Sequence, residues 1–435
     1  MGRTIIIEES VSDYISSLYG THKWQIGLII GQLSAQRDYI LHISRTPEQS
    51  GNSDGESKPA TIDEIENSWI IEHAHQVSRM LTGGLDVIGV FAFGPSDMLT
   101  KSQGKLRQLV FSIQKTVHHK PASYFDDLIH SRIILQICSA TKKYPDATPN
   151  PAEVKYQSFA SKWLKLETSL SLSNRQFTVP KKLERSGLQN QIMGSIHSML
   201  QSISSALCTV NGELCTDDQP LVSGEKPGKS SHSNTKSTQT FKIDLFTEEP
   251  CGASEPVETR TVASLVMSGS MSCRAYIHQK ATVREAIQAL KYDAVRSFLS
   301  RCEVLCEDVM DSQEEKTKNV PFSSTWTSPQ RVFAPLGTGP VTVCDYVFKD
   351  ETLKESRDRM SELLDVDTKE EDFEMQRGIP RSLVEEMETD SGDEKKTDSD
   401  PIQQGIGNRV IGAVVGIVIA VVAAGVTLLW GEQAG

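Results

Sequence analysis

Residues 410–430 form an apolar run, VIGAVVGIVIAVVAAGVTLLW, that contains no charged residue and one hydroxyl, at Thr427. At about 1.5 Å per residue, a helix of this length reaches about 31 Å, the hydrocarbon thickness of a bilayer. A helix satisfies its own backbone amides in lipid, whereas a strand in water does not stay apolar over such a length. The run from Val410 to Trp430 therefore predicts one transmembrane helix that anchors the chain.

Only residues 431–435 follow this span, so we expect a tail anchor with a short luminal tail and a cytosolic bulk. The N-terminal sequence MGRTIIIEES lacks the apolar region and the cleavage site of a secretory signal. Arg409 is the one base beside the span, and its exit is acidic, unlike the basic-flanked tails of mitochondrial outer-membrane proteins. We therefore expect a single-pass protein of the endoplasmic reticulum membrane.

Charge and cysteine usage agree with this topology. The eight cysteines are scattered without a CxxC motif, as expected for free thiols in a reducing compartment. The net charge is −12, and residues 365–400 alone carry 14 acids against 5 bases, which is −9. An acidic chain of this kind argues against nucleic-acid binding.

Strand and helix patterns alternate along the rest of the chain, which predicts a mixed α/β (α+β) fold. RTIIIE, KWQIGLIIGQLS and DYILHISR are typical of strands. Residues 61–81 carry apolar side chains three or four apart, which indicates an amphipathic helix with Thr61 or Asp63 near its cap. The run LDVIGVFAF then predicts a strand buried on both faces, and a second helix is expected to begin at Ser96.

Composition shifts divide the chain into segments. Polar, acidic and apolar stretches separate two mixed modules from a connecting region, a loop, a tether and the anchor. The expected segments are a first α/β module (1–180), a connecting helix and strand (181–223), a disordered polar loop (224–240), a second α/β module (241–364), an acidic disordered tether (365–409), the transmembrane helix (410–430) and the luminal tail (431–435).

The sequence offers few candidates for chemistry. His73 and His75 are two apart on a predicted helix, so they point in nearly opposite directions and cannot share a metal ion. Cys302 and Cys306 share a helical face, but without a second pair nearby they are best interpreted as buried thiols. Phosphate-binding and hydrolase motifs are absent from the sequence. We therefore expect no catalytic residue, no metal site and no cofactor.

Two apolar segments resemble the MPN fold, which is the fold of zinc-dependent deubiquitinases and their inactive relatives. In KWQIGLIIG, Gly27 and Gly31 match the glycines of the family's G-L-L-x-G motif, and in VIGVFAFGP, Gly89 and Pro95 match the ends of its zinc-binding turn. The resemblance implies that residues 1–180 are an MPN-like domain.

The same resemblance implies that the domain is catalytically inactive. Trp24 stands where the enzymes carry a glutamate general base, and Ala92 and Gly94 stand where they carry two zinc-binding histidines. Counting on without gaps places Ser102 at the serine position and Lys105 at that of the aspartate ligand. Zinc needs lone pairs, which alanine, glycine and a protonated lysine do not offer.

Taken whole, the chain resembles the odr-4 family of receptor-trafficking factors. The resemblance runs through RTIIIEESVSDYI, HKWQIGLIIGQLS, HAHQVSRMLTGGLDVIGVFAFGP and RVFAPLG to the C-terminal span. It implies a non-enzymatic adaptor of the endoplasmic reticulum that helps G-protein-coupled receptors reach the cell surface. The family is also linked to a ubiquitin-fold-modifier-specific cysteine protease, which it is thought to recruit to the membrane.

Two alternatives remain open. A membrane-bound hydrolase would need a low-pKa thiolate beside a histidine, and Cys273 with His278 is the near pair in sequence. A receptor chaperone would instead bind receptor helices through its own span, where Gly412 and Gly416 form a small-xxx-small face.

Overall fold

Six strands from the first part of the chain form one mixed sheet, in the order β5-β4-β2-β3-β1-β6. The computed structural model describes residues 4–34, 37–48, 59–125, 132–141, 153–159, 162–180, 187–222, 239–247, 261–315, 328–337 and 339–375. The six strands are β1 (Thr4–Ile7), β2 (Gln25–Gln32), β3 (Arg37–Arg45), β4 (Asp86–Gly94), β5 (Ile133–Cys138) and β6 (Glu153–Tyr156).

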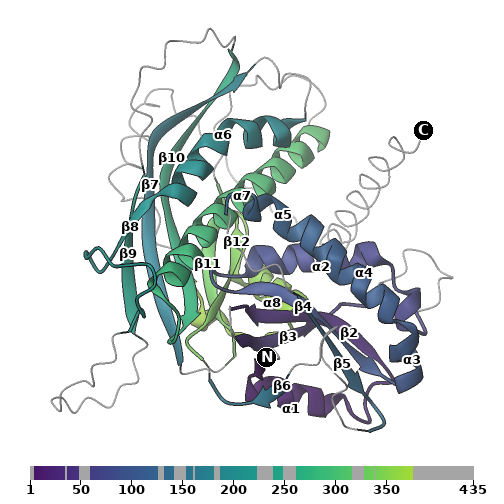
Figure 1. Ribbon diagram of the computed structural model, residues 1–435. Coiled ribbons are helices and arrows are strands. Elements are labelled where there is room, and N and C mark those ends of the chain that lie inside the picture. The colour runs from purple at the N-terminus through teal and green to yellow at the C-terminus, as the bar shows by residue number, and fades with distance from the viewer. Residues whose placement is uncertain are drawn as a thin grey trace. The chain divides into compact units, whose positions relative to one another are not determined.

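Helices cover both faces of this first sheet (Figure 1). On one face, α2 (Asn67–Met80) and α4 (Gln103–Ile113) share an apolar cluster with alternate residues of β2. On the other face, α1 (Glu9–Leu18) packs against Ile29 of the same strand. Because successive side chains of a strand point to opposite faces, the unbroken apolar run of β2 supplies both layers.

A second sheet is built on two long strands. β7 (Trp163–Pro180) pairs antiparallel with β10 (Thr261–His278), and the sheet order is β10-β7-β9-β8. Two long helices share its apolar cluster and lie beside it in Figure 1. The remaining elements of this group are β8 (Leu207–Val210), β9 (Thr240–Phe246), α6 (Leu188–Ser205) and α7 (Val283–Glu315).

A third, small sheet has the order β12-β11-β13 and lies near the C-terminal end of the described chain. Its strands are β11 (Gln330–Pro335), β12 (Thr342–Val347) and β13 (Glu374–Met375). The helix α8 (Leu353–Leu364) follows β12 and begins with a capping box, in which Thr352 and Glu355 bond each other's backbone amides. Met360 and Leu364 of α8 belong to the apolar cluster of the first sheet.

The mixed α/β class is confirmed, with differences at two predicted helices. The helix expected from residue 61 begins at Asn67, and its first turn is replaced by the 3-10 helix η1 (Ile62–Glu64). The helix expected from Ser96 is divided by Ser102 into α3 (Ser96–Lys101) and α4. It continues after α4 as the π-helix η2 (Gln114–His118) and α5 (His119–Ala122). Ile62 and Ile65 are buried although they lie outside α2. The apolar spacing therefore predicted the burial of these side chains correctly, but not their backbone conformation.

The acidic disordered tether predicted for residues 365–409 has buried side chains at its start. Val366 and Thr368 are buried, and β13 pairs with β11. The first residues of this segment are therefore partly packed, because Val366 and Thr368 alternate with the acids that suggested a solvated run, whereas most of residues 369–375 are exposed. The prediction of a tether stands for residues 376–409, which lie outside the described residues, as do residues 410–435.

The predicted boundary at residue 180 stays a prediction. β7 ends there, and it pairs along its length with β10 from the second predicted module. Most of the predicted loop, residues 224–238, lies outside the described part of the chain. Among the residues that are described, none of the helices is both long enough and apolar enough to cross a bilayer.

Candidate functional site

Three of the four positions that the MPN resemblance assigned to catalytic residues lie together at one end of β2 and β4. The antiparallel register pairs Gln25 with Phe93 and Ile26 with Ala92, so Trp24 comes beside Gly94. A Cβ atom placed on Gly94 would lie 3.4 Å from the Cβ of Trp24. Ala92 is fully buried in the apolar cluster under α2 and α4, and Trp24 packs against that cluster. Apolar packing therefore occupies this end of the strand pair.

Lys105, at the fourth position, makes hydrogen bonds instead of apolar contacts. Its ammonium group donates hydrogen bonds to the backbone carbonyls of Asp63, at 2.8 Å, and of Ile65. Burial lowers the pKa of this amine, although the nearby Asp63 carboxylate opposes the shift. Lys105 thus ties α4 to the η1 segment. Among the residues that the structure describes, no three histidine, cysteine or acidic side chains are grouped so that they could hold a metal ion.

The glycines that carry the MPN resemblance have a packing role. A Cβ atom on Gly27 would collide with the carbonyl of Ser44 on β3, and one on Gly89 would collide with that of Ile133 on β5. Glycine at these positions lets neighbouring strands approach closely, which requires no metal chemistry.

The two residues of the alternative hydrolase site do not lie together. Cys273 and His278 are five apart on β10, which separates them by about 17 Å and points them to opposite faces. Cys273 is buried in the cluster of the second sheet, and burial, with Asp293 nearby, raises the pKa of its thiol. His278 stacks on Tyr39 with ring centroids 4.4 Å apart. The structure therefore contradicts the low-pKa thiolate that this alternative required.

The other cysteine and histidine candidates are placed in the core or at its edge. Cys302 and Cys306 are buried, as expected, and burial raises the pKa of their thiols to about 12 and about 11. The two helix histidines do point apart: His73 is buried, while His75 Nε2 lies 3.7 Å from a carboxylate oxygen of Glu303 on α7.

A contact that sequence reasoning missed joins the end of α8 to the first sheet, and we call it the histidine junction. His42 Nε2 on β3 lies 2.6 Å from the carbonyl oxygen of Leu364, and His73 Nε2 on α2 lies 2.8 Å from that of Leu363. Ser44 Oγ donates to the Leu363 carbonyl as well, at 2.6 Å. These donors satisfy carbonyls that have no partner within the helix at its C-terminal end.

The histidine junction requires neutral imidazoles. Burial lowers the pKa of His42, although hydrogen bonding to Leu364 and the charge of Asp365 oppose the shift. Burial lowers the pKa of His73 to about 4, against its hydrogen bond to Leu363. Each ring must carry its proton on Nε2 to donate, and the Nδ1 atom of His73 is buried without a hydrogen-bond partner. A second proton there would leave a buried, uncompensated charge.

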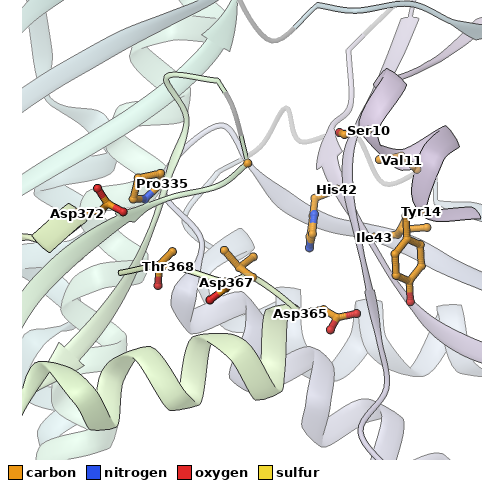
Figure 2. Close-up of a pocket in the computed structure, with 12 residues that line it drawn as sticks. Ser10, Val11, Tyr14, His42, Ile43, Pro335, Asp365, Asp367, Thr368 and Asp372 are labelled. Carbon is orange, nitrogen blue, oxygen red and sulfur yellow. The ribbon is translucent and has the colours of Figure 1, made fainter. Parts of the chain in front are cut away.

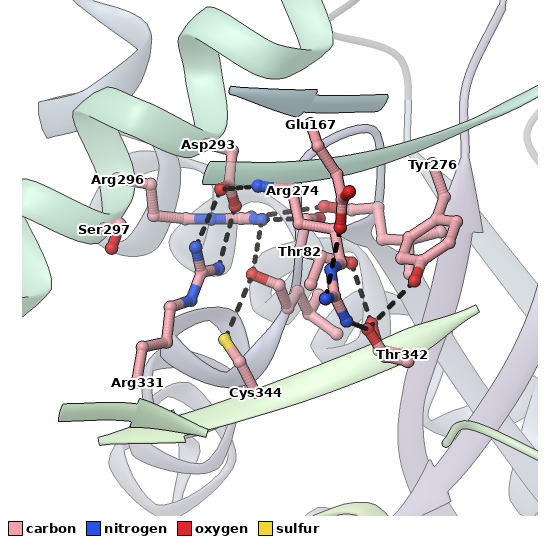
Figure 3. Close-up of polar contacts among 12 residues, drawn as sticks. Thr82, Glu167, Arg274, Tyr276, Asp293, Arg296, Ser297, Arg331, Thr342 and Cys344 are labelled. Atoms are coloured by element: carbon pink, nitrogen blue, oxygen red, sulfur yellow. Dashed lines mark hydrogen bonds and ion pairs between the residues drawn. The ribbon is translucent and has the colours of Figure 1, made fainter. Parts of the chain in front are cut away.

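A second polar cluster, the arginine junction, joins α7, β10 and β11 (Figure 3). Arg331 and Asp293 form two parallel hydrogen bonds of 2.7 and 2.9 Å, and both side chains are at most 1% exposed. The Asp293 carboxylate also accepts the backbone N–H of Arg274, at 2.9 Å. Burial alone would lower the pKa of Arg331, but Asp293 outweighs it and holds the pKa well above its ordinary value.

The arginine junction extends to the loop that follows α2. Arg296 donates to the carbonyls of Leu81 and Thr82, both at 2.8 Å, and the Thr82 hydroxyl donates to the carbonyl of Thr342. Arg274 reaches Glu374 on β13 at 2.7 Å. Elements from both predicted modules therefore share one hydrogen-bond network.

Comparison with known proteins assigns the family. The family model described as "ODR4-like: Odorant response abnormal 4-like" matches residues 27–375, which end where the described residues end. The chain belongs to the ODR4-like family. The matched residues include the histidine junction and the arginine junction. They also include the second and third sheets, and all of the first sheet except β1 and the start of β2.

Two vertebrate relatives match this ODR4-like chain along nearly its whole length, and a nematode relative matches most of it. The protein named odr-4 homolog from Mus musculus is 34% identical over 98% of this chain and 99% of its own. The homolog from Homo sapiens is 32% identical over the same shares. The odorant response abnormal protein 4 of Caenorhabditis elegans is 23% identical over 83% of this chain and 76% of its own.

Among solved structures, the crystal structure of UfSP from C. elegans matches 84% of this ODR4-like chain and 57% of its own chain. The identity is 8% and the TM-score is 0.42, which is too low to carry an argument about the fold.

Proposed function

We propose that this ODR4-like chain is a non-enzymatic, tail-anchored adaptor of the endoplasmic reticulum membrane. It promotes the folding and trafficking of G-protein-coupled receptors of the odorant-receptor type. It also brings a ubiquitin-fold-modifier-specific cysteine protease to the membrane. Membership of the odr-4 family supports this role, and the name of its nematode relative refers to odorant response.

The packing at the degenerate enzyme positions is the observation that carries the non-enzymatic part. If the first sheet is MPN-like, its metal site would lie at the end of β2 and β4. Trp24, Ala92 and Gly94 fill that place with apolar contacts, and the Lys105 ammonium is directed to backbone carbonyls. None of these groups can supply a lone pair to zinc at neutral pH. Such a domain acts by binding rather than by catalysis.

The mechanism of a tethered adaptor is an increase in effective concentration. A soluble protease that binds the cytosolic part would meet membrane-bound substrates more often, without any change in its own chemistry. The histidine junction supports this arrangement, because it fixes residues 363–364 to the first sheet only a short way before the acidic segment that leads to the predicted anchor.

Deletion of residues 401–435 tests the tether. We expect both the shortened chain and the bound protease to move from the membrane fraction to the cytosolic fraction. A matched control replaces residues 410–430 by an unrelated tail-anchor span of equal length, which should keep both proteins on the endoplasmic reticulum. Protease that stays on membranes after the deletion would contradict the proposal.

A poly-leucine span tests the rival in which the helix itself binds receptors. If the helix is only an anchor, receptor trafficking persists with poly-leucine in place of residues 410–430. Loss of trafficking, with normal membrane localisation, would instead assign receptor binding to the face that contains Gly412 and Gly416.

A further inference from the structure

His278, the last residue of β10, presents one hydrogen-bond donor to the surface from a ring that is otherwise buried. The residue is 5% exposed, and its Nδ1 atom accepts the backbone N–H of Lys280 at 3.3 Å, so the proton of the ring lies on Nε2. Nε2 has no hydrogen-bond partner in the described part of the chain, and it is not among the unpartnered atoms that are closed off from solvent. The adaptor role does not use this donor.

The orientation of the His278 ring is fixed by its neighbours. Tyr39 stacks on it with ring centroids 4.4 Å apart, and Trp163 lies edge-on to it at 6.4 Å. In the turn that follows, the backbone N–H of Gln279 donates to the carbonyl of Lys162 at 2.9 Å. A donor that is already held in place loses little freedom when a ligand binds to it.

Three positive side chains surround this donor. Lys280 and Lys162 lie on the two sides of the turn, and Arg37 lies on the same face of β3 as Tyr39, to which it donates a hydrogen bond. None of the three forms an ion pair with an acidic side chain in the described part of the chain. Burial lowers the pKa of His278 to about 4, and the charges of these three residues add to the shift. The imidazole is therefore neutral and lies in a positive field.

One acidic side chain lies near this group without cancelling its charge. Glu285 raises the pKa of Tyr39, in addition to the effect of burial. Its carboxylate already accepts the backbone N–H and the hydroxyl of Thr282, at 2.8 and 3.4 Å. Three cations against one carboxylate leave a net positive charge around the His278 donor.

The surroundings of His42 carry the opposite charge. His42 lines a cavity of about 550 Å³ beside the histidine junction, together with Asp365, Asp367 and Asp372 (Figure 2). Both histidines are neutral at physiological pH, because burial lowers the pKa of each. His42 is therefore an internal control for any anion that binds at His278.

We propose that His278 Nε2 and the side chains of Arg37, Lys162 and Lys280 bind a phosphate group. Its source is either a soluble phosphate or the headgroup of a membrane lipid. A phosphate group carries several acceptor oxygens and up to two negative charges, which suits one fixed N–H donor among dispersed cations. A carboxylate offers two oxygens and a single charge, so it would satisfy fewer of these donors. A metal cation would be repelled.

NMR of the full chain, labelled in its histidine rings and held in maltoside micelles that contain no phosphate, tests this site. At about pH 7.5 His278 is neutral, and its signal is identified by its loss in His278→Gln. Inorganic phosphate is titrated at constant ionic strength, so that general screening does not change. We expect a saturable shift of the His278 signal and none of the His42 signal. Acetate should bind at least about tenfold more weakly.

A second arm distinguishes the two sources. Micelles mixed with phosphatidic acid present the phosphate at a surface, whereas glycerol 3-phosphate at the same concentration presents it in solution. A larger His278 shift with phosphatidic acid would assign the site to a lipid headgroup, and an equal or smaller shift would assign it to a soluble phosphate. Either result requires that His278 responds to phosphate, and therefore supports the site.

Exposed side chains supply variants that leave the core intact. Lys280→Gln keeps the backbone N–H that holds His278, and should weaken phosphate binding several-fold. Lys280→Gln combined with Arg37→Gln should weaken it at least about tenfold. The matched control is Lys242→Gln, which removes an exposed lysine that pairs with Asp244 on β9. It should leave phosphate affinity unchanged, because solvent screens distant surface charges.

Four outcomes would overturn the proposal: no shift at His278, an equal shift at His42, equal binding of acetate, or full affinity in the double variant. The adaptor role rests on the anchor and the family, so these results would leave the deletion experiment on residues 401–435 unaffected. Release of the protease in that experiment would likewise say nothing about phosphate binding.

Discussion

The arginine junction and the histidine junction both connect the C-terminal part of the described chain to earlier elements, but with opposite chemistry. The first places an ionised pair, Arg331 and Asp293, where no water reaches it. The second uses neutral imidazoles to satisfy helix-end carbonyls, and burial keeps those imidazoles uncharged. The first should therefore be sensitive to the loss of either partner, whereas the second should be sensitive to acid.

The largest effect is expected from Arg331→Met. This change leaves the Asp293 carboxylate buried with a single backbone donor, so the free energy of unfolding should fall by about 3–5 kcal/mol. Urea unfolding of the full chain, followed by tryptophan fluorescence, measures it. The control is Arg331→Met combined with Asp293→Asn, which removes the unpaired charge and should recover at least about half of the loss. A loss below about 1 kcal/mol in the single variant would show that the junction does not hold these elements together.

Acid should act on the histidine junction. The pKa of His73 is about 4 in the folded protein and near 6.5 in the unfolded chain, so the unfolded state binds more protons between these values. The stabilisation is complete above about pH 6.5 and is lost as the pH falls towards 4, by about 3 kcal/mol for this residue.

Urea unfolding at several pH values measures this loss, and His73→Gln is the matched variant. Glutamine keeps an N–H donor for the Leu363 carbonyl but does not titrate. The stability of the variant should therefore fall less steeply between pH 6.5 and 4, while His42 and His278, whose pKa values are also lowered, keep part of the slope. Identical pH profiles for both proteins would rule out His73 as a sensor of acid.

Ser44→Ala should have a smaller effect. The Leu363 carbonyl loses one donor but keeps the bond from His73, so the expected loss of stability is about 1 kcal/mol. The pH profile should keep its shape, because serine does not titrate in this range. A change in the slope with pH would mean that Ser44 also sets the protonation of His73.

The smallest effect is expected for an exposed pair that serves as the contrast to Arg331 and Asp293. Arg284 lies 3.2 Å from Asp217, and both side chains are more than half exposed. Arg284→Ala should change the free energy of unfolding by no more than about 0.5 kcal/mol, because solvent screens such pairs. A loss comparable to that of Arg331→Met would break the comparison, since burial would then not decide the strength of an ion pair in this protein.

The local sequence pattern predicted most of the strands and helices, but not which of them contact each other. The spacing in KWQIGLIIG and LDVIGVFAF predicted buried strands, and β2 and β4 are both buried nearly throughout. The same spacing wrongly extended α2 back to residue 61, because Ile62 and Ile65 are buried in a different backbone conformation. The acidic composition after residue 364 likewise suggested solvent exposure, although Val366 and Thr368 are buried. Their burial depends on contacts with residues that are distant in the sequence.

The MPN resemblance remains a prediction, and it did not indicate the contacts that its assigned residues make. The register of β2 and β4 brings Trp24 and Gly94 together. Lys105 was expected only as a missing ligand, whereas its ammonium group holds the carbonyls of Asp63 and Ile65. Hydrogen-bond partners of this kind follow from the path of a loop, which periodicity does not describe.

The sequence by itself determined the mixed α/β class, the positions of most strands and helices, and membership of the odr-4 family. It could do so because burial imposes a short repeat on strands and helices, and because family motifs are continuous in sequence. Only the tertiary structure decided that His42 meets the carbonyl of Leu364, 322 residues later, and that Arg331 pairs with Asp293 in the core. Those contacts depend on the order in which strands pair, and hydrophobic spacing carries no information about that order.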